Sequence, residues 1–108
     1  MIDTLVRVVV DRPLGSCHPK HKDMIYPVNY GYVKDVIGGD GEEQDAYILG
    51  VDQPLARFTG CVIAIIHRTD DVEDKLVVAP VGVTFDEGQI KEATHFQEQY
   101  FKSYIELI

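Results

Sequence analysis

Short runs of apolar and β-branched residues recur along most of the chain, separated by polar or Gly- and Pro-rich stretches. This pattern is typical of β-strands joined by turns. Five runs predict short strands, at residues 5–10, 26–33, 46–51, 61–67 and 75–79. The stretch 12–23 predicts a loop, and the glycines within 38–41 predict a tight turn.

The last part of the chain has a helical period. Thr84-x-x-Glu87 is a capping-box signature, which predicts that a helix begins there. Apolar residues then recur at three- and four-residue spacing and predict one apolar face, made of Ile90, Ala93, Phe96, Tyr100 and Tyr104. We therefore expect one C-terminal helix that packs on the strands.

These elements predict a mostly β (α+β) fold: a small, mostly antiparallel barrel of five strands with the C-terminal helix packed on it. The 108 residues, 45% of them apolar, suit a single domain over residues 1–108. The chain opens directly into a strand-like run without a signal-peptide pattern, and no apolar run is long enough to cross a bilayer. We expect a cytoplasmic location and no membrane partner.

The charge distribution adds a functional prediction to this picture. Residues 40–45 (the first acidic loop) and residues 70–74 (the second acidic loop) carry four carboxylates each. The other ten acidic residues match the ten Lys and Arg, so the net charge of −8 lies in these two loops. Eight carboxylates repel one another unless a multivalent cation lies between them. We therefore expect a site for a hard metal ion such as Mg²⁺.

The same acidic balance argues against nucleic acid as a partner, since nucleic-acid binding needs a basic surface. A small anionic substrate, carried by metal ions and a few cationic side chains, fits the composition better. Zinc at Cys17-His18-x-x-His21 is an alternative. No fourth ligand follows at zinc spacing, however, and Pro19 interrupts any helix that would align the two histidines.

Four motifs together resemble one enzyme family. Residues 26–32 read Tyr-Pro-Val-Asn-Tyr-Gly-Tyr, and the first acidic loop is an Asp-Gly-acid turn that ends in a second Asp. The second acidic loop leads into Lys-Leu-Val-x-x-Pro at 75–80, and residues 95–100 read His-Phe-Gln-Glu-Gln-Tyr. In type, order and spacing these motifs resemble the family I soluble inorganic pyrophosphatases, from about Val8 to Lys102.

The resemblance implies one inorganic-pyrophosphatase-like domain with a five-stranded barrel of OB type. It also implies hydrolysis of inorganic diphosphate to two phosphates with several Mg²⁺ ions, Mn²⁺ being an alternative. Carried over residue by residue, it implies metal ligands at Asp40, Asp45, Asp70 or Asp71, and Glu73 or Asp74. Asp11 stands where the family has a Glu that contributes to the metal site.

The resemblance further implies a set of phosphate-binding residues. Lys75, Tyr30 and Tyr100 match the lysine and the tyrosines that contact phosphate in that family, and Lys20 matches the lysine of its Pro-x-Lys loop. The family's phosphate-binding Arg has no counterpart at its usual place before the Tyr-Pro motif. Arg12 lies close by in the sequence and is a candidate substitute.

The chain also departs from the family pattern. Glu42 stands where the family has the Asp that takes part in activating the attacking water, so we assign the general base to Glu42. Glu43 replaces a Pro of the turn, and Phe101 occupies the position at which the family's Lys follows its Tyr. The acidic half of the site is thus nearly complete, whereas the cationic half is thinned.

From these residues we expect Mg²⁺-dependent hydrolysis of diphosphate by a metal-activated water, with Glu42, Lys75 and Tyr30 in catalytic roles. Two alternatives stay open: hydrolysis of another phosphoanhydride, such as a nucleotide or a short polyphosphate, and a non-catalytic module that binds metal or phosphate. A homo-oligomer is also open, because bacterial members of the family commonly form homo-oligomers.

Overall fold

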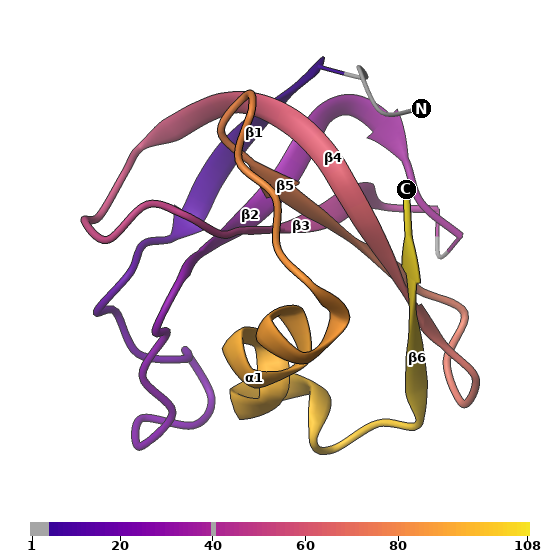
Figure 1. Ribbon diagram of the computed structural model, residues 1–108. Coiled ribbons are helices and arrows are strands. Elements are labelled where there is room, and N and C mark those ends of the chain that lie inside the picture. Colours follow the sequence, from indigo (N-terminus) through magenta and orange to yellow (C-terminus); the bar gives the residue numbers. More distant parts are fainter. Residues whose placement is uncertain (1–4, 40) are drawn as a thin grey trace.

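The computed structural model describes residues 5–39 and 41–108. Figure 1 shows strands that curve over the helix. In chain order the elements are β1 (Leu5–Arg12), β2 (Asn29–Ile37), β3 (Glu43–Ile48), β4 (Arg57–Arg68), β5 (Asp74–Ala79), α1 (Glu87–Glu98) and β6 (Ser103–Leu107).

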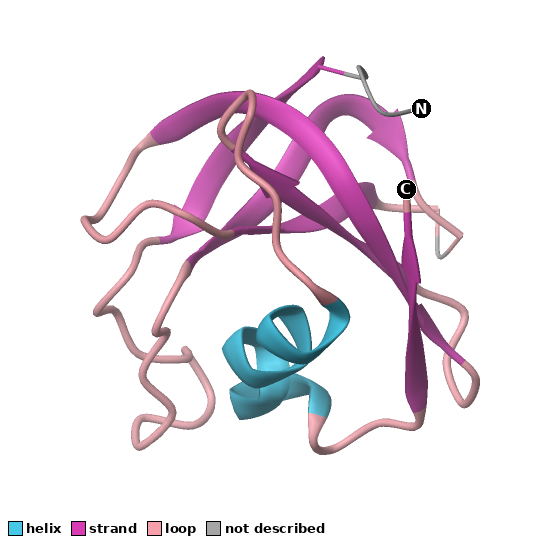
Figure 2. Cartoon of the chain, in the orientation of Figure 1, coloured by secondary structure: helices cyan, strands magenta, loops and turns pink. Residues whose placement is uncertain are grey.

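Five of the strands form a closed barrel. They are hydrogen-bonded in the order β1-β2-β3-β5-β4, and a further pairing of β1 with β4 closes the circle. Every pairing is antiparallel except that of β3 with β5. The predicted fold class is therefore confirmed: a five-stranded, mostly antiparallel barrel with a helix against it. Figure 2 shows how the helix lies against the strands.

Strand β3 is buried on both faces, because the barrel core covers one face and α1 covers the other. Ala46 and Ile48 face a core cluster inside the barrel, whereas Tyr47, on the opposite face, packs with Ile90 and Phe96 of α1. Strands buried on both faces carry near-continuous apolar runs, as β3 does in its second half. A Cβ on Gly31 of β2 would collide with the carbonyl oxygen of Val9, so glycine allows β1 and β2 to approach closely.

The predicted start of the helix is wrong by two residues. The N-cap is Asp86, whose carboxylate accepts a hydrogen bond from the Gln89 amide at 2.7 Å. The Gln89 side chain accepts one from the Asp86 amide in return, at 2.9 Å, which completes a capping box. The signature at Thr84 and Glu87 has the same spacing, so the sequence pattern offered two registers.

The predicted end of the helix is also wrong, because α1 ends at Glu98 and a sixth strand follows. Tyr100 and Tyr104 lie outside the helix and are 66% and 57% exposed. Within the described residues, β1 pairs with β4 from Arg57 to Cys61, and β6 pairs with it from Ala64 to Arg68. Pairing with β6 gives partners to a strand edge that would otherwise stay open.

No helix in the described part of the chain is long and apolar enough to span a membrane.

Replacing Asp86 by Ala is expected to lower the free energy of unfolding by about 1 kcal/mol, because the first turn of α1 loses its cap. The matched control is Thr84→Ala, which removes the residue of the sequence-predicted cap and is expected to change nothing. Chemical unfolding of both variants measures the difference. An equal loss for both, or a loss for Thr84→Ala alone, contradicts the observed cap.

A second prediction concerns His67, which links β4 to both of its neighbours at this end. Its Nε2 lies 2.7 Å from Glu106 of β6, and its Nδ1 lies 3.1 Å from Asp74 of β5. The hydrogen bond with Glu106, followed by the charge of Asp74, raises the pKa of His67 above its ordinary value of 6.5. A raised folded-state pKa stabilises the fold fully below the unfolded-state pKa, and this stabilisation is lost as the pH rises through the folded-state pKa.

We therefore expect the free energy of unfolding to fall as the pH rises from about 5 to about 8, and to fall less steeply in His67→Gln. The control is His95→Gln, which removes an exposed histidine and should keep the wild-type slope. Denaturant unfolding at a series of pH values, with a chelator present, provides the measurement. Identical slopes for wild type and His67→Gln would show that the linkage does not exist.

Candidate active site

A cavity of about 900 Å³ lies between the loop that follows β1, the barrel strands and the end of α1. Charged and phenolic side chains from all five barrel strands, from the loop after β1 and from the turn after α1 line it. Among the residues that line it are Asp11, Arg12, Tyr30, Asp45, Lys75 and Tyr100. Residues that the sequence singled out at widely separated positions are therefore brought together in the fold.

Lys75 is the cation that joins the two acidic loops. Its side chain is only 3% exposed, because the alternation along β5 turns it inward while Asp74 turns outward. The ammonium lies 2.5 Å from Asp45 of the first loop and 2.5 Å from Glu73 of the second. Burial alone would lower the pKa of Lys75, but Tyr30 and the hydrogen bonds with both carboxylates raise it, so the lysine stays charged.

Tyr30 stands beside this ion pair. The Lys75 ammonium lies 5.8 Å from the centre of the Tyr30 ring. Burial, above all, raises the pKa of Tyr30 above its ordinary value. The phenol therefore remains protonated and is a hydrogen-bond donor at neutral pH. A protonated phenol and an ammonium, side by side in one cavity, suit the oxygen atoms of an anion.

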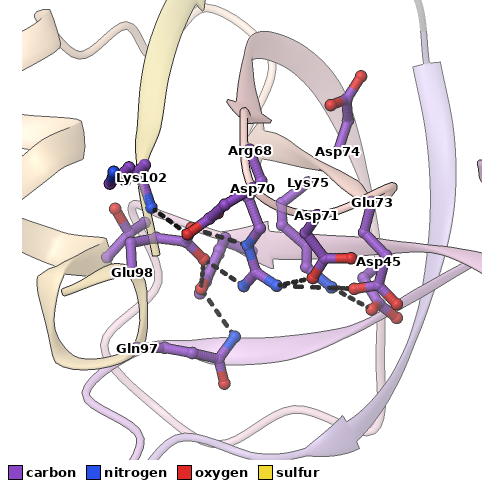
Figure 3. Close-up of polar contacts among 12 residues, drawn as sticks. Asp45, Arg68, Asp70, Asp71, Glu73, Asp74, Lys75, Gln97, Glu98 and Lys102 are labelled. Carbon is purple, nitrogen blue, oxygen red and sulfur yellow. Dashed lines mark hydrogen bonds and ion pairs between the residues drawn. The ribbon is translucent and has the colours of Figure 1, made fainter. Parts of the chain in front are cut away.

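Arg68, at the end of β4, is the second buried cation of the site (Figure 3). Its side chain is 4% exposed, and its Nε and Nη2 donate to the two carboxylate oxygens of Glu98 at 3.0 and 2.7 Å. Its Nη1 lies 3.4 Å from Asp71 and 3.6 Å from Glu73. Burial would lower the pKa of Arg68, but the hydrogen bonds and the charge of Glu98 raise it.

A continuous row of side-chain hydrogen bonds connects the two arginines of the cavity. Arg12 donates to the Tyr26 hydroxyl at 2.7 Å, and Tyr26 donates to the Gln97 side chain at 3.0 Å. Gln97 donates to the Tyr47 hydroxyl at 2.8 Å, and Tyr47 donates to Glu98 at 2.6 Å. We call this row, with the Arg68–Glu98 pair, the buried relay. Because each member is satisfied by the next, these polar groups are buried without an unpaired atom.

Arg68, Gln97 and Glu98 were not predicted from the sequence, although the patterns of β4 and α1 pointed to the first two. The inward positions of β4 alternate through Ala64 and Ile66, so Arg68 falls on the buried face of the strand. Gln97 lies seven residues after Ile90 and therefore on the same face of α1. A charged or amide side chain at a core-facing position predicts a buried polar partner.

The structure separates the acids that the sequence left as alternatives. Asp71 and Glu73 face the cations of the site, as Figure 3 shows. Asp70 instead accepts a hydrogen bond from the Lys102 amide at 3.1 Å, and Asp74 pairs with His67. These placements leave metal binding by any of them a prediction. Asp40, the other expected ligand, lies outside the described residues.

The described residues do not complete a metal site. Carboxylates are the donors that Mg²⁺ prefers, yet residues 5–39 and 41–108 contain no group of three or more acidic, His or Cys side chains that converge as ligands. Lys75 and Arg68 instead lie among the carboxylates of both loops. The zinc alternative at Cys17, His18 and His21 likewise finds no such group in this part of the chain.

The remaining predicted residues divide between the cavity and its surroundings. Arg12 and Tyr100 line the cavity, Arg12 from the end of β1 and Tyr100 from the turn after α1. Lys20 is exposed, and among the described residues of its loop His18 and His21 line the cavity, whereas Lys20 does not. Glu42, the predicted base, lies on the exposed turn before β3.

Removing one hydroxyl from the buried relay tests its contribution to stability. Tyr47→Phe deletes the group that donates to Glu98 and accepts from Gln97. We expect the free energy of unfolding to fall by about 1–3 kcal/mol, because Gln97 and Glu98 each lose one buried hydrogen bond. Tyr104→Phe removes a hydroxyl from an exposed tyrosine and serves as the control. Equal stability of the two variants would contradict a structural role for the relay.

Comparison with known proteins gives the fold and the family. No protein-family model matches the chain. The inorganic pyrophosphatase of Ralstonia nicotianae is 30% identical over an alignment of length 110, and the alignment covers 84% of this chain and 58% of that protein. The inorganic pyrophosphatase of Bacillus sp. strain PS3 is 31% identical over an alignment of length 97, and the alignment covers 74% of this chain and 57% of that protein. The chain thus spans little more than half the length of these relatives.

Solved structures agree on the fold. The crystal structure of the inorganic pyrophosphatase from Ehrlichia chaffeensis superposes with a TM-score of 0.76 at 16% identity, covering 100% of this chain and 88% of that one. The inorganic pyrophosphatase from Neisseria gonorrhoeae gives a TM-score of 0.62 at 23% identity, covering 95% of this chain and 79% of that one. Together with the sequence relatives, these likenesses show that the chain belongs to the family I soluble inorganic pyrophosphatases.

Proposed function

We propose that this chain hydrolyses inorganic diphosphate in the cavity beside Lys75, with a divalent cation such as Mg²⁺. The observation that carries the proposal is that Lys75, Tyr30 and Asp45 line one cavity. The family resemblance assigns the first two residues to phosphate binding and Asp45 to metal binding. Family membership supports the reaction class. The whole activity is proposed here because the chain spans little more than half of its relatives.

In this proposal the cationic and phenolic groups hold the substrate. Lys75 and Arg12 neutralise phosphate oxygens, and the Tyr30 hydroxyl donates a hydrogen bond to one of them. Tyr100 contributes from the rim of the cavity. Groups that already line the cavity need little reorganisation to stabilise the charge that develops on the leaving phosphate.

In this proposal the carboxylates of the acidic loops bind the metal ion and activate the attacking water. Glu42 is proposed as the general base, with Asp45 nearer to the cavity. Mg²⁺, when bound, lowers the pKa of a bound water and so supplies the nucleophile. Asp45, Asp71 and Glu73 are the described carboxylates that we propose as its ligands. Lys75 and Arg68 also contact these carboxylates.

A second function is favoured by that same placement of Lys75 and Arg68. Two protein cations already contact carboxylates of the acidic loops, which suits a module that binds phosphate or diphosphate without hydrolysing it. Such a module would keep its anion affinity in the absence of a divalent cation. Thermal stability separates the two functions, because a ligand that binds only the folded state raises the melting temperature.

The central test is the release of phosphate from diphosphate, with and without Mg²⁺ or Mn²⁺. Asp45→Asn keeps the shape of the side chain but removes its charge, and we expect activity to fall by roughly 100-fold or more. Asp52→Asn, on an exposed loop residue, provides the control and should match wild type. Nucleotides and short polyphosphates tested in parallel identify the preferred phosphoanhydride.

Two results would overturn the proposed enzyme. Wild-type protein that releases no phosphate at millimolar Mg²⁺, at any pH from about 6 to about 10, is not a diphosphatase. Equal activities of Asp45→Asn and Asp52→Asn would place the chemistry elsewhere. A rise of the melting temperature with diphosphate, without any turnover, would favour the binding module.

A further inference from the structure

The cavity contains an arginine to which the sequence motifs assign no role. Arg68 lines it together with Lys75, and its side chain is almost completely buried. Buried guanidinium groups are uncommon without a partner, since removing the charge from water is costly. Glu98 is that partner, but a pair with only a structural purpose gains little over apolar residues of the same volume. The pair therefore calls for a reason other than stability.

Three contacts fix the plane of the Arg68 guanidinium. Glu98 accepts from Nε and Nη2 at 3.0 and 2.7 Å, which is a two-point contact that sets both position and orientation. The Phe101 ring lies against the guanidinium, with Cζ 3.6 Å from the ring centre. Such stacking leaves the edge of the guanidinium open for hydrogen bonds.

The edge that does not face Glu98 is held only loosely. A guanidinium has five N–H groups, and Glu98 engages one on Nε and one on Nη2. The Nη1 contacts, 3.4 Å to Asp71 and 3.6 Å to Glu73, are longer than a good charge-assisted hydrogen bond. A phosphate oxygen that enters the cavity can form a shorter contact at this edge.

Arg68 and Lys75 are also close neighbours. Both contact the same oxygen atom of Glu73, Lys75 at 2.5 Å and Arg68 at 3.6 Å. Two cations that share one carboxylate oxygen lie close enough together for one small anion with two linked phosphate groups to contact both. Phe101 occupies the position where the sequence motif leads one to expect a lysine, and the stacked Arg68 brings a positive charge to that place.

We propose that Arg68 is a substrate-binding residue that holds one phosphate group of a diphosphate-type anion beside Lys75, and that Glu98 is its positioning residue. The inference rests on the proposed function for the identity of the anion. Arg68 would then supply the positive charge that the expected lysine, replaced here by Phe101, would otherwise bring to the phosphate-binding residues.

The test measures anion binding directly. The double variant Arg68→Met/Glu98→Gln removes both charges together, so that neither is left buried alone. Isothermal titration with inorganic diphosphate, in a chelator that prevents turnover, is expected to show an affinity about 10- to 100-fold weaker than wild type, because charge-assisted hydrogen bonds are lost. Arg57→Met, at the exposed far end of the same strand, is the matched control and should bind as wild type does.

A second variant separates substrate binding from structural support. Arg68→Lys keeps the charge but loses the two-point contact with Glu98, and it is expected to lose less affinity than the double variant. With Mg²⁺ present, both variants should raise KM more than they lower kcat. If the double variant does not fold, Arg68→Lys against Arg57→Met provides the comparison by itself.

The outcomes distinguish this inference from the proposed function. Wild-type protein that binds diphosphate, together with an Arg68 variant that binds it equally well, overturns the inference and leaves the function standing. Wild-type protein that binds but never hydrolyses, with binding lost in the double variant, supports the inference and overturns the function. No binding of diphosphate by wild type in the chelator overturns the inference, whereas the proposed function is decided separately by phosphate release with Mg²⁺.

Discussion

The buried carboxylate of Glu98 is the point on which the site depends. It accepts hydrogen bonds from Arg68 of β4 and from Tyr47 of β3, and it lies at the end of α1. One side chain thus joins the helix to two barrel strands and orients a cation of the cavity. A charge buried in this way is tolerated only while its partners are in place. The same contacts therefore hold the helix on the barrel and shape the cavity.

Lys75 makes the corresponding connection between the acidic loops. Without a cation between them, Asp45 and Glu73 would repel each other, and the loops would separate. The lysine is inward because β5 is a strand, so the alternation of that strand decides the electrostatics of the site. The two acidic loops, for which the sequence predicts a metal ion, are joined in the fold by the ammonium of Lys75.

Much of the fold follows from local sequence patterns, whereas the details of the site depend on contacts between residues that are far apart in the sequence. The β-branched and aromatic runs predicted all five barrel strands, although not their bounds, and the period of Ile90, Ala93 and Phe96 predicted the helix. Strand β6 was missed because Tyr100 and Tyr104 continue the helical spacing, while the open edge of β4 that β6 covers exists only in the folded barrel.

The same distinction applies to the site. The motif resemblance led to Tyr30, Asp45 and Lys75, which line one cavity. It could not lead to the Arg68–Glu98 pair, whose members are 30 residues apart and meet only through tertiary structure. A double-mutant cycle on unfolding free energy, with Arg68→Met, Glu98→Gln and the pair, tests the central role of this contact most directly. Each single change should cost about 3 kcal/mol or more, and the pair clearly less than their sum. Costs that simply add would contradict it.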